Sequence, residues 1–109
     1  MAGLRGYANL PSYSAIKYAI IGFTKADGLR HATDLIRVNA ICPGSTETPL
    51  LGEVSDDIGT STASMTKDVA VGRLGLPEEV AESLVWIVSH RASLVTATTL
   101  AANGGMVGA

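Results

Sequence analysis

Apolar residues recur at helical spacing in two parts of this chain and gather in short runs in two others, and each pattern predicts a different kind of element. From Tyr13 to about His31, apolar positions such as Ile16 and Ile20 lie three or four residues apart, which predicts a helix. Further alanine, isoleucine and glycine residues leave this helix little polar face, so we expect other elements to cover it on more than one side. Gly28 is expected to weaken its last turns.

Start signals mark the first helix and a second one. Ser12 stands where an N-cap belongs, directly before the first helix. In "RLGLPEEVAESLVWIVSH", Pro77 falls in the first turn, and Glu78 and Glu79 place negative charge at the positive end of the helix dipole. The apolar face of this second helix consists of Val80, Leu84, Trp86, Ile87 and Val88.

Two short apolar runs, one after each helix, predict buried strands. "LIRVNAICPG" closes with Pro43 and Gly44, and the β-branched run "SLVTATTLAANGG" stops at Gly104 and Gly105. Strands separated by a helix predict a βαβ unit with a parallel strand pair, and therefore an α/β fold. Two strands make a marginal sheet, so we expect its edges and the first helix to need partners that this chain does not contain.

Residues 50–68 differ from the rest of the chain. Glycine, serine, threonine and aspartate dominate there, with few apolar residues. This composition predicts a mobile segment with a turn or two of helix.

Composition narrows the class of protein. The length of 109 residues fits one domain, the hydrophobic share is 47%, and a net charge of −2 comes from scattered charges, so we expect no nucleic-acid partner. No apolar run of about 18 residues and no signal-peptide pattern occur, so we expect no membrane contact and a cytoplasmic location. Cys42 is the single cysteine, which excludes an internal disulfide and a cysteine metal site, and we expect a small buried hydrophobe rather than a reactive thiol.

Candidate chemistry begins at Tyr13 and Lys17, which lie four residues apart and therefore on one face of the predicted helix. A nearby ammonium stabilises a phenolate and draws a tyrosine pKa down from about 10. Such a tyrosine is suited to moving the proton while an alcohol and a carbonyl interconvert, with a cofactor carrying the hydride. By itself the pair is also compatible with a packed tyrosine and a solvated lysine, because chance gives about 0.2 such pairs in a chain of this length.

Four motifs taken together resemble the C-terminal part of a classical short-chain dehydrogenase/reductase. They are the Tyr-x-x-x-Lys helix in "YSAIKYAIIGFTKA", the strand ending in Pro-Gly in "IRVNAICPGSTETPLL", the helix in "GRLGLPEEVAESLVWIVS", and the closing strand in "SLVTATTLAANGG". The resemblance covers residues 1–109 in order. It implies the C-terminal portion of one doubly wound, Rossmann-like parallel sheet, with NAD or NADP as cofactor and residues 50–68 as a substrate lid. Within the matched region, Ala97 stands where the family usually has glycine and Asn103 where it usually has aspartate.

The resemblance also implies roles for the first motif. Tyr13 would be the catalytic acid/base, and Lys17 would hold the ribose hydroxyls of the nicotinamide as well as tune Tyr13. In this family the Tyr-x-x-x-Lys helix and the last strand with its preceding helix form subunit interfaces. We therefore expect the parent protein to be a homo-oligomer, a dimer or a tetramer, acting on a small alcohol or carbonyl compound.

Five further residues take cofactor roles by the same resemblance. Pro43 and Gly44 would shape the turn against which the nicotinamide lies, the Ser45 and Thr46 backbone would face its carboxamide, and Thr48 would contact the cofactor near its phosphates. Plainer readings stay open for two of these features. Pro43 and Gly44 also suit a turn that only ends a strand, and Thr48 also suits a cap for a following helical turn.

Other family features are absent from these 109 residues. No glycine-rich Gly-x-x-x-Gly-x-Gly turn lies between a strand and a helix, and the family's active-site asparagine is missing. The family's serine would fall immediately before Met1, so we expect Met1 to be an internal methionine of a longer parent. The sequence thus predicts a truncated fragment of an oxidoreductase that is inactive alone. The alternatives are a non-catalytic fragment that retains only oligomerisation surfaces and a freestanding binding domain.

Overall fold

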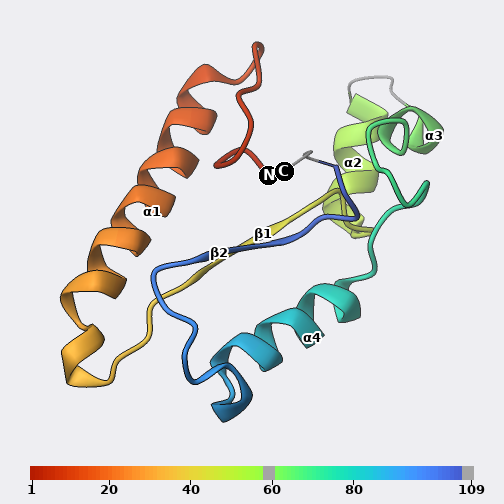
Figure 1. The fold of residues 1–109 in the computed structure, drawn as a ribbon. Coiled ribbons are helices and arrows are strands. Elements are labelled where there is room, and N and C mark those ends of the chain that lie inside the picture. The colour runs from red at the N-terminus through yellow and green to blue at the C-terminus, as the bar shows by residue number, and fades with distance from the viewer. Residues whose placement is uncertain (58–60, 107–109) are drawn as a thin grey trace.

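The computed structural model describes residues 1–57 and 61–106 of the chain. Two parallel strands, β1 (Ala40–Pro43) and β2 (Thr99–Ala102), form its centre, with Ala40 opposite Thr99 and Pro43 opposite Ala102. Helix α1 runs along one side of the strand pair and α4 along the other (Figure 1). The helices are α1 (Pro11–Arg30), α2 (Pro49–Asp57), α3 (Thr62–Met65) and α4 (Pro77–Val88), with short 3-10 turns η1 (Ala32–Asp34) and η2 (His90–Ala92).

The parallel pair confirms the predicted βαβ unit, but both strands are shorter than the apolar runs that predicted them. Leu35 and Ala97 have left-handed backbone, with φ of 60° and 55°, so the chain turns before each strand begins. Before the strands, side-chain hydrogen bonds alternate with backbone ones, such as that from the Ala97 amide to the Val38 carbonyl at 2.9 Å. Thr96 Oγ1 accepts from the Val38 amide at 3.2 Å, and Asn39 Oδ1 accepts from the Thr98 amide at 3.2 Å.

Helix α1 begins two residues earlier than predicted, and the expected N-cap at Ser12 is wrong. Pro11 occupies the first turn and Ser12 follows it inside the helix, while no side chain caps the helix start at Leu10. The fixed φ of proline suits the first helical position, where an amide hydrogen has no partner in any case. Ser14 lies further along the first turn and accepts a hydrogen bond from the Tyr7 amide at 3.0 Å.

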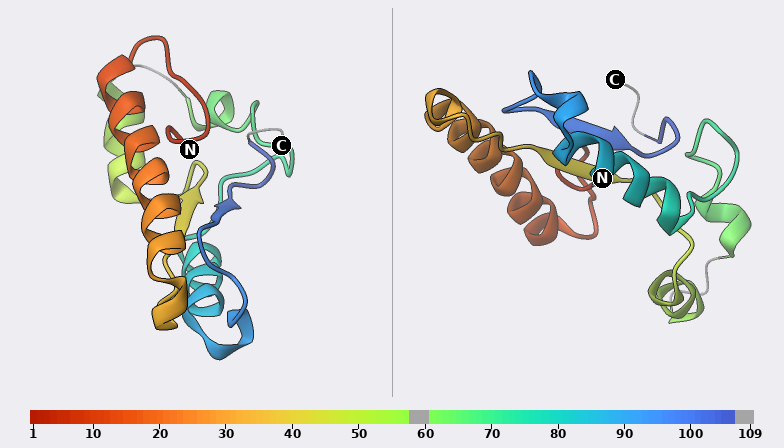
Figure 2. Two further views of the ribbon diagram at one scale, coloured as in Figure 1. Left: turned by 60° about the vertical axis from the view of Figure 1, so that its left-hand side comes forward. Right: turned by 90° about the horizontal axis from the view of Figure 1, so that it is seen from below.

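Helices α2 and α3 lie beyond the C-terminal ends of both strands (Figures 1 and 2). They occupy the segment predicted from composition to be mobile, and residues 58–60 between them lie outside the described residues. Side-chain caps start both helices, because Thr48 Oγ1 accepts from the Leu51 amide and Ser61 Oγ accepts from the Ser64 amide, each at 3.3 Å. The chain returns to the end of β1 through an isolated parallel bridge between Thr46 and Gly75.

The core is small for the apolar content of the chain. The buried apolar side chains are Ala2, Ile21, Cys42, Val69, Ile87 and Ala92, so the expected burial of Cys42 is confirmed. The accessible surface is 7286 Å², whereas a compact protein of this mass exposes about 5700 Å². The Cα radius of gyration is 15.3 Å, against about 13 Å for a compact chain of this length. The fold therefore leaves a substantial apolar surface uncovered, as the over-apolar first helix predicts.

None of the helices in the described part of the chain has the length and hydropathy needed to cross a membrane. Residues 1–57 and 61–106 also contain no group of three or more histidine, cysteine or acidic side chains that could hold a metal ion.

Candidate functional site

An open cleft of about 400 Å³ lies at the C-terminal end of β1. In parallel α/β sheets, ligands bind outside the carboxyl ends of the strands, which is where this cleft lies. Tyr13 contributes to one wall, and the other is the segment that follows β1, here named the Pro43–Thr48 turn. The cleft is lined by six of the seven residues singled out in the sequence, Tyr13, Pro43, Gly44, Ser45, Thr46 and Thr48.

The seventh residue, Lys17, lines an adjoining cavity of about 350 Å³ that shares Tyr13, Pro43 and Gly44 with the cleft. The Lys17 ammonium nitrogen lies 5.3 Å from the centre of the Tyr13 ring, as their spacing of one helical turn predicts. Tyr13 is 49% exposed, so a ligand in the cleft can reach its side chain. The structure thus brings the tyrosine, the lysine and the turn together around one opening.

Close backbone packing fixes the first part of the Pro43–Thr48 turn. The Gly44 amide donates to the Ala102 carbonyl at 3.0 Å, extending the strand ladder by one residue. A Cβ atom on Gly44 would lie 2.8 Å from the Asn103 Cα, so only glycine fits there. Within the described part of the chain, the amides of Ser45 and Thr46 donate to no other group. Two unpaired donors beside the cleft fit a ligand that carries hydrogen-bond acceptors.

Thr48 has the plain structural role that the sequence left open, since its hydroxyl caps α2. It also lines the cleft, so capping and ligand contact remain compatible. Further lining residues that sequence reasoning missed come from distant parts of the chain. They include Tyr7 and Leu10 before α1, Leu50 and Leu51 in α2, and Met106 after β2, and no local pattern links these positions.

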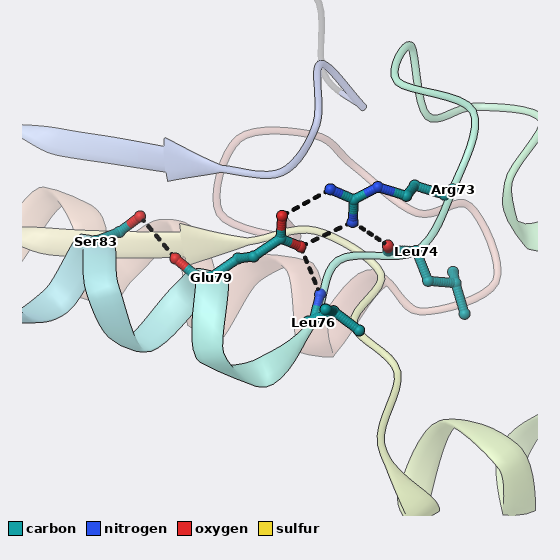
Figure 3. Close-up of polar contacts among 5 residues, drawn as sticks. All are labelled: Arg73, Leu74, Leu76, Glu79 and Ser83. Atoms are coloured by element: carbon teal, nitrogen blue, oxygen red, sulfur yellow. Dashed lines mark hydrogen bonds and ion pairs between the residues drawn. The ribbon is translucent and has the colours of Figure 1, made fainter.

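Sequence reasoning also missed an ion pair at the start of α4. Both carboxylate oxygens of Glu79 accept from the Arg73 guanidinium, at 2.7 and 2.8 Å, and one of them also accepts from the Leu76 amide at 2.8 Å (Figure 3). Hydrogen bonds from Arg73 and from the Leu76 amide lower the pKa of Glu79 from 4.5 to about 2. The available signal was a glutamate at the third position of a helix, where glutamate reaches back to cap the helix start.

Comparison with known proteins settles the family. The family model described as enoyl-(acyl carrier protein) reductase matches residues 1–107. The chain belongs to the short-chain dehydrogenase/reductase family. The Tyr13–Lys17 helix and the Pro43–Thr48 turn both lie inside the part of the chain that this family model matches.

Relatives of this chain within the short-chain dehydrogenase/reductase family include both dehydrogenases and reductases. The chain is 40% identical over 103 residues to the cis-4-hydroxycyclohexanecarboxylate dehydrogenase of Sinomonas cyclohexanicum, covering 94% of this chain and 40% of that protein. It is 38% identical over 106 residues to the 3-oxoacyl-(acyl-carrier-protein) reductase FabG of Vibrio harveyi, covering 97% of this chain and 42% of that protein. The chain thus spans about two fifths of the length of these curated relatives.

A solved structure confirms the fold class. The crystal structure of a variant actinorhodin polyketide ketoreductase with NADPH matches with a TM-score of 0.92 and 36% identity, covering 99% of this chain and 44% of that one. The predicted fold class, the C-terminal portion of a Rossmann-like short-chain dehydrogenase/reductase sheet, is therefore confirmed.

Proposed function

We propose that this chain carries the acid–base pair and the nicotinamide-facing turn of an NAD(P)-dependent oxidoreductase that interconverts an alcohol and a carbonyl by hydride transfer. The observation that carries the proposal is the shared cleft, in which Tyr13 faces the Pro43–Thr48 turn with Lys17 one helical turn away. The names of relatives support the reaction class, because they include a cyclohexanol dehydrogenase from an Acinetobacter strain and a ketoreductase with bound NADPH.

Tyr13 and Lys17 have different tasks in the proposed reaction. The Tyr13 hydroxyl gives or takes the proton at the substrate oxygen, for which its exposure to the cleft is required. The three donors of the Lys17 ammonium hold the ribose hydroxyls of the cofactor. When bound, NAD or NADP supplies or accepts the hydride.

The turn supplies the remaining contacts of the proposed site. The unpaired amides of Ser45 and Thr46 donate to the carboxamide, and Pro43 and Gly44 form the surface against which the nicotinamide ring lies. The Thr48 hydroxyl contacts the cofactor near its phosphates while continuing to cap α2. Residues 50–68 are proposed to act as a substrate lid, since Leu50 and Leu51 at their start line the cleft.

We further propose that these 109 residues do not catalyse the reaction alone. A glycine-rich turn is the part of such folds that holds the pyrophosphate, and the sequence contains none between a strand and a helix. Exposed apolar side chains on α1, among them Ile16, Ile20 and Phe23, support oligomer formation by the parent and an alternative role as a non-catalytic oligomerising fragment.

A hybrid enzyme tests the catalytic proposal. Residues 1–109 are joined to the upstream part of the Vibrio harveyi reductase, and NADPH oxidation is followed with a 3-oxoacyl thioester. We expect turnover that falls by about 10² or more in Tyr13→Phe, the order of the general acid–base contribution. Tyr18→Phe, a change of the same kind on the same helix, should leave it unchanged. A hybrid that binds NADPH and keeps its full turnover in Tyr13→Phe would contradict the role of Tyr13, and one that binds NADPH without turnover would favour the non-catalytic alternative.

The isolated chain tests the proposed incompleteness. Purified residues 1–109 are titrated with NADH and NADPH while the nicotinamide fluorescence is recorded. We expect no saturable signal at micromolar concentrations, because the pyrophosphate has no glycine-rich site in this sequence. Tight saturable binding to the wild-type chain, lost in Lys17→Met, would overturn this part of the proposal.

A further inference from the structure

Two backbone hydrogen bonds join Gly75, which lies just before α4, to the Pro43–Thr48 turn. The Gly75 amide donates to the Ser45 carbonyl at 3.0 Å, and the Glu47 amide donates to the Gly75 carbonyl at 2.8 Å. Gly75 is therefore hydrogen-bonded to the Pro43–Thr48 turn on both sides of Thr46. Any movement of Gly75 is transmitted to the two residues that flank Thr46.

The Arg73–Glu79 ion pair brackets Gly75 in turn. One Arg73 nitrogen donates to the Leu74 carbonyl at 3.0 Å, and Glu79 accepts from the Leu76 amide at 2.8 Å (Figure 3). The peptide groups before and after Gly75 are thus both held by the same two side chains. The two parallel hydrogen bonds between guanidinium and carboxylate fix the mutual orientation of these side chains as well as their distance.

The Arg73–Glu79 pair is attached to a helix that packs on the strand pair. Glu79 belongs to the first turn of α4, and α4 packs against the strand pair with Ile87 buried. The pKa of Glu79 near 2 keeps its carboxylate charged well below neutral pH. A continuous chain of contacts leads from the helix through Glu79 and Gly75 to the cleft wall.

We infer that Arg73 and Glu79 are positioning residues for the Pro43–Thr48 turn. The inference rests on the proposed function, which assigns this turn to the nicotinamide. Neither side chain lines the cleft itself, and both are about half exposed, at 57% and 47%. Exposed ion pairs contribute little to global stability, so the main effect of this pair is on the local geometry that its backbone contacts define.

Two acidic residues in one helical turn provide a matched test. Glu79→Gln removes the bidentate pair with Arg73, whereas Glu78→Gln removes the same charge at the same helix end, where the described residues give Glu78 no side-chain partner. Residue-resolved amide hydrogen exchange on the full chain is measured at Glu47 and Gly75. The Ala40 and Gly44 amides, which donate to Thr98 and Ala102 in and beside the strand ladder, serve as references.

In Glu79→Gln we expect exchange at Glu47 and Gly75 to accelerate about tenfold, the scale of one lost charge-assisted hydrogen bond. The Ala40 and Gly44 amides should keep their rates, and Glu78→Gln should change none of the four. Arg73→Lys, which keeps the charge but not the bidentate geometry, should give an intermediate acceleration. Equal acceleration at all four amides would reduce the pair to general stabilisation and overturn the inference, and so would unchanged rates at Glu47 and Gly75.

The link to the cofactor is read separately in the hybrid enzyme. Glu79→Gln should raise the NADPH dissociation constant several-fold, because the contacts of the Pro43–Thr48 turn with the nicotinamide are weakened. Glu78→Gln should leave this constant unchanged. Faster exchange at Glu47 and Gly75 without any wild-type binding of NADPH would count against the proposed function and leave the positioning of the turn established. Binding of NADPH by the wild-type hybrid, together with unchanged exchange in Glu79→Gln, would support the proposed function and overturn the positioning role of the pair.

Discussion

The two sides of the strand pair are held by different kinds of contact. On the α4 side, the Arg37 guanidinium donates to the carbonyls of Ile87, Val95 and Ser89 at 2.8, 2.9 and 3.1 Å, joining positions at least fifty residues apart. On the α1 side, large apolar side chains face outward, and Phe23 is 69% exposed. Polar contacts within the chain therefore hold the α4 side to the strands, whereas no side-chain hydrogen bond within the described residues joins α1 to them. Both helices leave large apolar side chains exposed.

This difference matters for function because the candidate site takes residues from both sides of the strand pair. The Pro43–Thr48 turn continues β1 and is held through Gly75 by the α4 side. Tyr13 and Lys17 come from α1, which no side-chain hydrogen bond within the described residues joins to the strands. The chain therefore fixes one half of the cleft itself, and the position of the other half depends on how firmly α1 is seated. Substitutions on each side can test this difference.

The largest effect is expected at Arg37. Arg37→Met keeps the aliphatic stem but removes three hydrogen bonds from a charged donor. The Val95 and Ser89 carbonyls keep a second donor each, whereas the Ile87 carbonyl is left without one among the described residues. We expect the free energy of unfolding to fall by about 3 kcal/mol, because bonds from charged donors are stronger than neutral ones and an unpaired acceptor carries a penalty. Urea unfolding followed by the fluorescence of Trp86, the single tryptophan, measures this loss.

Arg91→Met is the control for that change. Arg91 is exposed in η2, and its side chain makes no hydrogen bond within the described residues. Its replacement should change the free energy of unfolding by less than about 0.5 kcal/mol. Equal losses in the two variants would mean that the α4 side is not held by the Arg37 contacts.

The seating of α1 is tested at its buried glycine. A Cβ atom on Gly28 would lie 2.8 Å from the Ala97 Cα and 2.9 Å from the Val38 carbonyl oxygen, so Gly28→Ala forces α1 away from the strands. We expect a loss of about 2 kcal/mol in the free energy of unfolding. Gly22 lies in the same helix with open space around it, so Gly22→Ala should instead stabilise by about 0.5–1 kcal/mol. A stabilising Gly28→Ala would show that α1 is not seated on this contact.

Gly28 also shows where sequence reasoning stopped. The helix, its apolar excess and the Tyr13–Lys17 contact were predictable because they depend on spacings of three and four residues. Gly28 suggested only a weak helix end, since its neighbour Ala97 is remote in the chain. The three acceptors of Arg37 and the left-handed backbone at Leu35, which shortens β1, likewise depend on contacts or turns that no local period encodes.

A smaller effect is expected from the pH dependence of the Arg73–Glu79 pair. The pKa of Glu79 falls from 4.5 to about 2 on folding, so the unfolded chain binds the proton more tightly than the folded one. The stabilisation is complete above about pH 4.5 and is lost as the pH falls through about 2. The difference in thermal midpoint between the wild-type chain and Glu79→Gln should therefore stay constant near neutral pH and shrink across this range.

Glu78→Gln again provides the comparison for that titration. Its midpoint should follow the wild-type curve across the same range, apart from the small offset of one surface charge. A wild-type minus Glu79→Gln difference that does not change between about pH 4.5 and 2 would mean that the ion pair is not formed in solution.

The smallest effect is expected at the hinge before β2, where both sides of the molecule meet. Ala97 has a φ of 55°, a conformation that costs an alanine about 1–2 kcal/mol and a glycine almost nothing. Ala97→Gly removes this strain but gives the unfolded chain more freedom, so we expect a net gain of about 0.5 kcal/mol in the free energy of unfolding. Ala81→Gly, an exposed position in the middle of α4, should instead lose about 1 kcal/mol. Because Gly28 packs on Ala97, the gain depends on α1 lying against this hinge. If both glycine variants destabilise equally, the left-handed turn that brings α1 and β2 together does not form.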